Sequence, residues 1–344
     1  MRRAPSAAGI ATLEARHRAG RAREVLAALP TLGRNASANP RFDRVGAPLI
    51  TVVIPTYNWS SVLRFAVASA LGQTYPRVEV VVVGDACTDD SAEVVESFAD
   101  ERVRWYNLEQ NSGSQSTPNN VGIELARGEL IAYLGHDDLW LPTHLALVAD
   151  ALLREEADLA HSITQQVGPP GSGYRALTGV SPRSRAAGKL WIPPSSIVHR
   201  KNLIESMGGW RDYRTLYVPP DYEFVCRAND HGARFARVLA LTVFKFNSAY
   251  RRNSYIEKPW HEQARYARRI ETEHGFLYRE LAAVTATYIR GLFGSIEKGL
   301  PKLPTAPDPL PPGWHVTQYR RIRGLEPQSE SPDSGRRPAP HTRT

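Results

Sequence analysis

The stretch LIAYLGHDD, residues 130–138, combines an apolar run with an acidic end. The apolar run predicts a buried strand, which ends at Gly135, His136 and the adjacent acids Asp137 and Asp138. Two neighbouring carboxylates repel each other, and the repulsion grows near a low-dielectric sheet. A divalent cation, Mg²⁺ or Mn²⁺, would remove it, because both ions prefer hard oxygen ligands and commonly bridge diphosphates. For this pair taken alone, a turn with two solvated acids is an equal alternative.

Apolar runs and amphipathic stretches alternate on both sides of this strand. The apolar runs are residues 50–57, 78–85, 103–108, 130–135 and 159–167. The amphipathic stretches are residues 60–71, 89–98, 116–126 and 142–154. This alternation predicts an α/β fold with a mostly parallel sheet and helices on both faces. Residues 78–83 are β-branched almost throughout, as expected of a strand that is buried on both faces.

Polar residues follow three of the predicted strands, in the segments PTYN (55–58), GDACTDDS (84–91) and GHDD (135–138). Ligands of open α/β sheets bind beyond the carboxyl ends of the strands, so we expect one crevice there. Tyr57 would stack on a nucleobase, with core packing as an equal alternative, and Asp85 would accept an N–H group of the base. Helix capping is the favoured role of Asp89 and Ser91. No G-x-G-x-x-G or P-loop motif is present, which argues against the common phosphate cradles.

These segments, taken in order, resemble family 2 glycosyltransferases over about residues 48–245. The resemblance rests on residues 51–58, 85–91, 111–128, 134–140, 195–200, 207–210 and 221–227. It implies a GT-A fold, in which a nucleotide-sugar-binding α/β domain joins an acceptor-binding region. It also implies an inverting glycosyltransferase of glycan biosynthesis that moves a sugar from a nucleotide-diphosphate sugar, UDP-sugar being our first choice, to an acceptor hydroxyl. A divalent metal, Mn²⁺ or Mg²⁺, would assist by neutralising the departing diphosphate.

The resemblance also implies roles for individual residues. The nucleotide-binding candidates are Pro55, Thr56, Tyr57, Asn58, Asp85 and Asp137. The remaining candidates are Asp137 and Asp138 for the metal, Asp221 for the catalytic base, and Trp210 and Glu223 for the acceptor. An inverting transfer needs such a base opposite the leaving group. Asp221 follows two prolines and also suits a helix cap, so both interpretations stay open.

Two positions depart from the family pattern. Gly135 stands where the family often has an Asp, and Asn119 stands where it often has an Arg. Without an Asp at position 135, the motif offers fewer metal ligands. For the neighbouring His136, the favoured role is that of a hydrogen-bonded loop residue. This departure motivates the alternative hypothesis of a catalytically inactive nucleotide-sugar-binding relative that acts as a binding module.

Composition changes along the chain predict its domain organisation. We expect an Arg-rich helical segment and linker over 1–46, a GT-A domain over 47–247, C-terminal helices over 248–300, and a disordered Pro/Ser/Arg-rich tail over 301–344. Within the GT-A domain, residues 47–167 form the nucleotide-sugar half and 168–247 the acceptor half. We expect the basic ends to be dispensable for nucleotide binding. The apolar side chains of residues 281–298 favour packing on the body, with membrane-surface binding as the alternative.

The whole-chain composition narrows the partners. The 344 residues are 42% hydrophobic and 23% charged, with two cysteines and a formal net charge of +8. No run predicts a transmembrane segment, and no hydrophobic secretory signal is present. The basic charge favours acidic partners, but the aromatics do not interleave with basic residues, which argues against nucleic acid. We expect a cytoplasmic bacterial protein with a glycan, lipid-linked or small-molecule acceptor, and peripheral association with the inner face of the membrane as an option.

Overall fold

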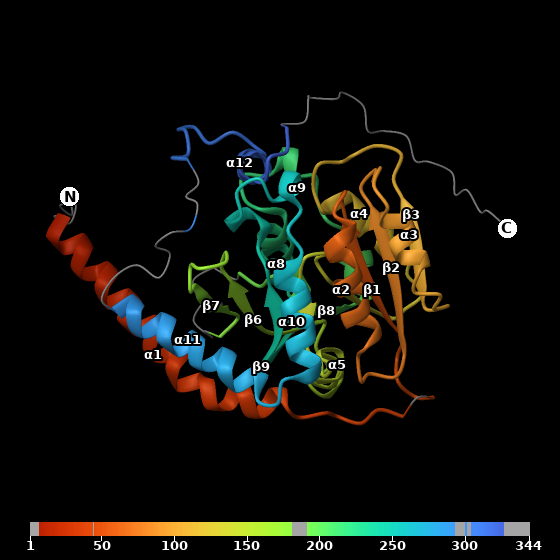
Figure 1. Ribbon diagram of the computed structural model, residues 1–344, viewed down its shortest axis with the longest axis horizontal. Coiled ribbons are helices and arrows are strands. Elements are labelled where there is room, and N and C mark those ends of the chain that lie inside the picture. Colours follow the sequence, from red (N-terminus) through yellow and green to blue (C-terminus); the bar gives the residue numbers. More distant parts are fainter. Residues whose placement is uncertain (1–6, 44, 181–190, 293–299, 301–303, 327–344) are drawn as a thin grey trace.

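A nine-stranded sheet forms the centre of the computed structural model, which describes residues 7–43, 45–180, 191–292, 300 and 304–326 (Figure 1). The strands are β1 (Ile50–Thr56), β2 (Val78–Gly84), β3 (Val103–Asn107), β4 (Leu130–Tyr133), β5 (Leu139–Trp140), β6 (Leu159–Val167), β7 (Arg175–Thr178), β8 (Ile197–Arg200) and β9 (Phe235–Lys245). Their order is β3-β2-β1-β4-β8-β6-β9-β5, with β7 paired to β6. The predicted α/β fold class is therefore confirmed.

The first half of the sheet is parallel, and the second half is mixed. Strands β3, β2, β1 and β4 run in the same direction, so their carboxyl ends meet at one edge. Strand β8 is antiparallel to both β4 and β6, whereas β9 is parallel to β6 and antiparallel to β5. All seven residues of β2 are buried, as the β-branched run predicts. This topology gathers the polar strand ends of the nucleotide half in one place.

Helices cover both faces of the sheet because alternate residues of a strand point to opposite sides. Val52 contributes to a core with α2 (Ser60–Leu71) and α5 (His144–Arg154). Its neighbour Val53 contributes to a second core on the other face. The helices of that second face are α4 (Ser116–Leu125), α7 (Lys201–Met207) and α8 (Pro220–Asp230), while the short α3 (Ser91–Glu96) packs beside α2 and β3.

The long helix α1 (Ala7–Ala36) packs against α11 (Phe276–Leu292), and the two run side by side in Figure 1. Leu281 and Val284 of α11 are buried in a cluster that also contains Leu32 of α1. For residues 281–298 the sequence left two alternatives, packing on the body and membrane-surface binding, and the described part packs on the body. Residues 293–299 lie outside the described residues. None of the helices in the described ranges has the length and apolar character that crossing a bilayer requires.

The C-terminal part corrects one prediction of the sequence. Helix α12 (Trp314–Arg323) lies inside the range 301–344 that the composition predicts to be disordered. It is anchored by backbone hydrogen bonds from Asn253 to Ile322 (2.8 Å) and from Gly313 to Leu216 (2.7 Å). The prolines that suggested disorder lie in the segment before α12. The helix itself is held in place by residues that are distant in the sequence. The remaining helices are α9 (Ser254–Glu257) and α10 (His261–Thr272), with 3₁₀ turns at Pro194–Ser196, Tyr213–Thr215 and Ser248–Tyr250.

Candidate active site

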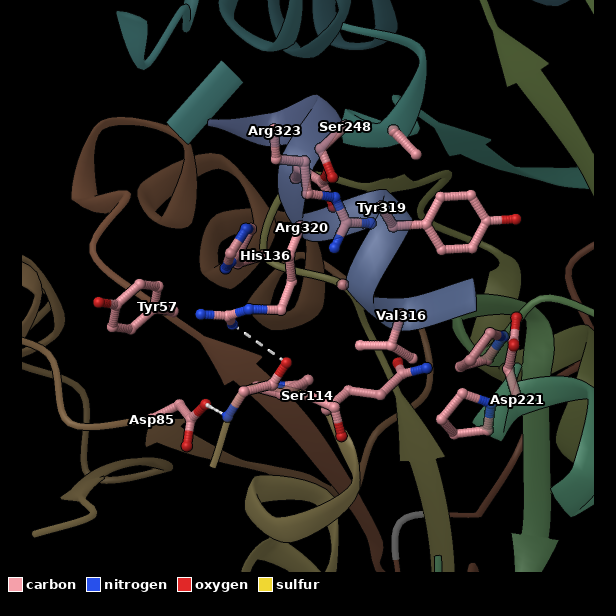
Figure 2. Close-up of a pocket in the computed structure, with 18 of the residues that line it drawn as sticks. Tyr57, Asp85, Ser114, His136, Asp221, Ser248, Val316, Tyr319, Arg320 and Arg323 are labelled. Carbon is pink, nitrogen blue, oxygen red and sulfur yellow. Dashed lines mark hydrogen bonds between the residues drawn. The ribbon is translucent and has the colours of Figure 1, made fainter. Parts of the chain in front are cut away.

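A crevice of about 220 Å³ lies beyond the carboxyl ends of β1, β2 and β4. Its floor is formed by Thr56, Tyr57, Asp85 and Asp137 at the strand ends, as the sequence predicts. The far wall begins at Pro219 and continues through the first turn of α8 and the segment after β9. Its cover is formed by Tyr255 and by Val316, Tyr319, Arg320 and Arg323 of α12, four of which are labelled in Figure 2.

At one end of the crevice, Tyr57 and Asp85 stand as a base-binding pair would. The Tyr57 ring lies 6.3 Å from the Tyr255 ring at an angle of 29°. Asp85 accepts hydrogen bonds from the backbone N–H groups of Ser112 (2.7 Å) and Gly113 (3.1 Å). Burial raises the pKa of Asp85, while these N–H groups and the Arg320 charge oppose the rise. The Asn111 side-chain amide also donates to Asp85 (3.1 Å), which leaves about one of the four acceptor positions of a carboxylate for a ligand.

Asn58, predicted to bind the nucleotide, is not among the residues that line the crevice. Its backbone has a left-handed φ of 44°, which Asn tolerates. Its side-chain oxygen accepts from the backbone N–H groups of Thr88 (2.7 Å) and Asp89 (3.3 Å). Asp89 in turn accepts from the N–H of Ser91 (3.2 Å), the first residue of α3, but the N-cap position is Asp90 and has no side-chain cap, so the predicted N-cap roles of Asp89 and Ser91 are not observed. Asn58 therefore holds the loop after β2 rather than the ligand.

Asp138, predicted to be a metal ligand, is fully buried and does not line the crevice. Its Oδ2 accepts from Ser195 Oγ (2.5 Å) and Lys245 Nζ (2.9 Å), and its Oδ1 accepts from the Phe246 N–H (3.1 Å). Burial raises its pKa to about 6, against the opposing pull of the Lys245 charge. We call these residues the Asp138 hub. The hub uses both carboxylate oxygens of Asp138 to join the turn after β4, the 3₁₀ turn before β8 and the end of β9, so the metal-ligand role of Asp138 stays a prediction that this geometry does not favour.

Asp137 is the member of the predicted metal pair that lines the crevice, and its carboxylate makes no hydrogen bond or ion pair within the described part of the chain. His136 adds no free ligand, because Nδ1 bonds Thr56 Oγ1 (3.0 Å) and Nε2 bonds the Tyr255 hydroxyl (3.2 Å). Burial lowers the pKa of His136, so the ring is neutral at pH 7.

Among the described residues, no group of three or more His, Cys, Asp or Glu side chains could hold a metal ion. Within the described part of the chain, the crevice therefore offers a dication one free protein carboxylate at the strand ends, that of Asp137, beside the cations Lys245, Arg320 and Arg323. The pair of protein ligands predicted for the divalent metal is not formed, and the other ligands of a bound ion would have to be phosphate oxygens and water.

Asp221 lines the crevice at the end opposite Tyr57 and Asp85, as Figure 2 shows. It lies in the first turn of α8, whose N-cap position is Pro219 and has no side-chain cap. Burial raises the pKa of Asp221, whereas Lys245, backbone N–H groups and Arg323 oppose the rise. Asp221 is thus a first-turn residue of α8 that also faces the crevice.

The two predicted acceptor residues lie elsewhere. Trp210 is 4% exposed and stacks on Phe224 with ring centroids 4.5 Å apart. Glu223 pairs with Arg227 (2.7 Å), which donates to the carbonyl groups of Met207, Gly208 and Gly209. Neither residue lines the crevice, so their contact with the acceptor stays a prediction that this geometry does not favour. Trp191, which is 49% exposed, is the tryptophan that lines it.

Tyr255, Arg320 and Arg323 line the crevice but escaped prediction from the sequence. The signal available was weak, namely the basic, aromatic-containing run from Gln318 to Arg323 in a Pro-rich segment. The helical spacing of Val316, Tyr319, Arg320 and Arg323 places these four side chains on one face of α12.

Comparison with known proteins finds a match for the part of the chain that supplies the strand ends of the crevice. Residues 51–203 match the family model Glycosyl transferase family 2. The Rickettsia typhi protein RT0329, an uncharacterized glycosyltransferase, is 36% identical over 29% of this chain and 30% of its own length. EpsJ of Bacillus subtilis, also an uncharacterized glycosyltransferase, is 26% identical over 59% of this chain and 58% of its own length. The chain thus spans about a third or less of the first curated relatives it matches.

A solved structure supports the fold. The crystal structure of S. aureus TarS 1-349 in complex with UDP-GlcNAc is 19% identical to this chain and has a TM-score of 0.50. The likeness covers 80% of this chain and 90% of that one. The fold is therefore that of a glycosyltransferase of the GT-A type, as the resemblance implies.

Proposed function

We propose that this protein transfers a sugar from a nucleotide-diphosphate sugar to an acceptor hydroxyl, with inversion at the sugar carbon. One observation carries the proposal: a stacking ring and a strand-end carboxylate share one crevice with Asp221, which comes from the other half of the domain. The match to the Glycosyl transferase family 2 model supports the reaction class. The choice of uridine as the base, a glycan, lipid-linked or small-molecule acceptor, and association with a membrane face are sequence predictions kept here as proposals.

The proposed roles follow from position. Tyr57 stacks on the base, and Asp85 accepts an N–H group from the base edge. Asp221 takes the proton of the acceptor hydroxyl while the hydroxyl oxygen bonds to the anomeric carbon, and the bond from that carbon to the diphosphate breaks. Burial raises the pKa of Asp221, which makes the carboxylate a stronger base than an exposed Asp. No step of this proposal is routed through a metal.

Trp191 extends the proposal to the acceptor. It lines the crevice and is half exposed, so one face of the indole is open to a ligand. Aromatic faces present apolar surface at low entropic cost, which suits the apolar face of a sugar ring. We therefore assign acceptor contact to Trp191 in place of Trp210.

The experiment is a donor and transfer screen. Thermal shifts with UDP, GDP, dTDP and CDP identify the base, and mass spectrometry of incubations with the matching nucleotide sugars and candidate acceptors detects the added sugar mass. Binding together with transfer supports the proposal. Nucleotide binding without transfer to any acceptor favours the alternative, a nucleotide-sugar-binding module, which the lost acid at Gly135 also favours. A chain that binds none of the four nucleotides contradicts both.

A further inference from the structure

Helix α12 covers the middle of the crevice. Figure 2 shows Arg320 and Arg323 extending from α12 into the space between Tyr57 and Asp85 on one side and Asp221 on the other. In the proposed function, the base lies at the first end and the sugar carbon at the second. The diphosphate that joins them would then occupy the middle, in front of α12.

The two arginines are held differently. Arg320 is 8% exposed and donates to the carbonyl groups of Gly113 (3.2 Å) and Glu326 (3.0 and 3.2 Å). Because Gly113 also donates its N–H to Asp85, Arg320 ties α12 to the loop that surrounds the base end. Arg320 is therefore a positioning residue that closes this end of the crevice.

Arg323 makes no direct contact with an acidic side chain among the described residues. Its guanidinium lies over the rings of Tyr255 (6.0 Å) and Tyr319 (5.9 Å), and it forms no ion pair with any described residue. Its Nε is buried without a hydrogen-bond partner in the described part of the chain. A buried donor that stays unsatisfied costs free energy, and a charged one costs more. Such a group suits an anion that arrives with the ligand.

The other charged groups of the crevice are less available to a diphosphate than Arg323, because the Arg320 donors already have carbonyl acceptors. Asp138 is committed to the hub, and no metal-binding group of three acids, His or Cys exists among the described residues. The Lys245 ammonium is already paired with Asp138 at 2.9 Å. Among the cations that line the crevice, Arg323 is the one whose guanidinium N–H groups have no hydrogen-bond acceptor among the described residues.

We infer that Arg323 binds the diphosphate of the donor and of the departing nucleotide, and thereby supplies charge neutralisation that a fully ligated metal ion would otherwise provide. This inference rests on the proposed function. A planar guanidinium donates two parallel hydrogen bonds to phosphate oxygens, and such charge-assisted bonds are about twice as strong as neutral ones. Arg323 would hold the negative charge that grows on the diphosphate as the bond to the sugar breaks.

The test compares a nucleoside diphosphate with its nucleoside on the full chain. Calorimetric titrations use the best of UDP, GDP, dTDP and CDP and the matching nucleoside, each in Mn²⁺ and in EDTA. We expect wild type to bind the diphosphate in EDTA. Arg323→Ala should lower diphosphate affinity on the order of 10- to 100-fold, the loss typical of hydrogen bonds to charged groups, and leave nucleoside affinity unchanged. Arg323→Lys should recover part of the loss.

Arg321 is the matched control, because it lies on the same helix but is exposed and outside the crevice. Arg321→Ala should bind both ligands as wild type does. Arg320→Ala should weaken nucleoside and diphosphate alike, since it positions the base end. Thermal melting checks each fold, and Arg323→Gln replaces Arg323→Ala under the same criteria if the alanine variant does not fold.

Two results would overturn the inference and leave nucleotide-sugar binding intact. One is wild-type diphosphate binding that disappears in EDTA, and the other is an Arg323→Ala variant that binds the diphosphate like wild type. A wild type that binds neither diphosphate nor nucleoside, with or without Mn²⁺, would overturn the proposed function and the inference together.

Discussion

Thr56, Asp85 and His136 at the floor of the crevice are fixed by hydrogen bonds, whereas Arg323 in its cover lies over two tyrosine rings and makes no hydrogen bond among the described residues. Apart from the free carboxylate of Asp137, the floor is thus organised before any ligand arrives, as preorganised sites are. The cover retains an unsatisfied buried donor, so a ligand would complete its bonding. The comparison separates residues that shape the site from residues that a ligand would stabilise. It also predicts different outcomes for substitutions in the two regions.

The largest effect should come from Asp221→Asn, at the wall that joins floor and cover. The amide keeps the shape but takes no proton, so turnover should fall by roughly two to four orders of magnitude. Donor affinity should stay near wild type, because Asp221 would meet the acceptor hydroxyl. Steady-state rates with a saturating donor measure the change. Transfer by this variant at the wild-type rate would show that another residue of the crevice is the base.

Asp138→Ala should destabilise the fold by about 3–5 kcal/mol, because it leaves the Lys245 ammonium without its partner in the hub. Asp137→Ala is the matched control on the adjacent residue, because the Asp137 carboxylate makes no hydrogen bond with the described residues, and Gln263 bonds only its backbone carbonyl group. We expect Asp137→Ala to change stability by less than about 1 kcal/mol. Urea unfolding followed by circular dichroism measures both. Equal losses would contradict the division of roles between these two acids.

A chain that ends at residue 303 lacks α12 and tests the cover directly. We expect the sheet to stay folded, and nucleoside diphosphate affinity to fall on the order of 10- to 100-fold with loss of the arginine contacts. The composition of the tail favours the opposite outcome, in which the basic ends are dispensable. Calorimetry on the shortened and full chains decides between them, with circular dichroism as the check on folding.

The pH dependence of transfer should show a single acidic limb from Asp221. Burial raises its pKa, and only the ionised carboxylate accepts a proton, so the rate should rise with pH until it passes that raised pKa. Below the pKa the rate should fall about tenfold per pH unit, as for one ionisation. The residual rate of Asp221→Asn should lack this limb. If the rate of that variant still falls at low pH in the same way, the ionisation belongs to a group other than Asp221.

The floor could be predicted from the sequence because its signals are local. Buried strands followed by polar residues identify Tyr57, Asp85 and Asp137, and the parallel order of β2, β1 and β4 brings them together. Asp137 and Asp138 look alike in the sequence, yet only one lines the crevice. The partners that bury Asp138, Ser195 and Lys245, come from distant segments, so no local pattern could separate the two acids.

The cover and the acceptor wall could not be predicted for related reasons. Helix α12 is short, follows a Pro-rich segment and is fixed by contacts with Asn253 and Leu216. Trp210 and Glu223 stand in family-like motifs, but the same residue types also suit a stacked core ring and an ion pair. Distinguishing these roles requires knowing which side of α8 faces the sheet.

The backbone at Gly135 limits how this site could change by mutation. A Cβ there would lie 2.9 Å from Asp138 Oδ2 and 3.2 Å from Asp137 Oδ1, and the hub holds the Asp138 carboxylate in place. Gly135→Asp, the substitution that would recreate the acid often found in the family, therefore requires the Asp138 carboxylate to shift. Because that carboxylate also holds Ser195 and Lys245, a change at residue 135 would be transmitted to two segments that are distant in the sequence. The metal motif and the packing of the acceptor half are thus mechanically coupled through one side chain.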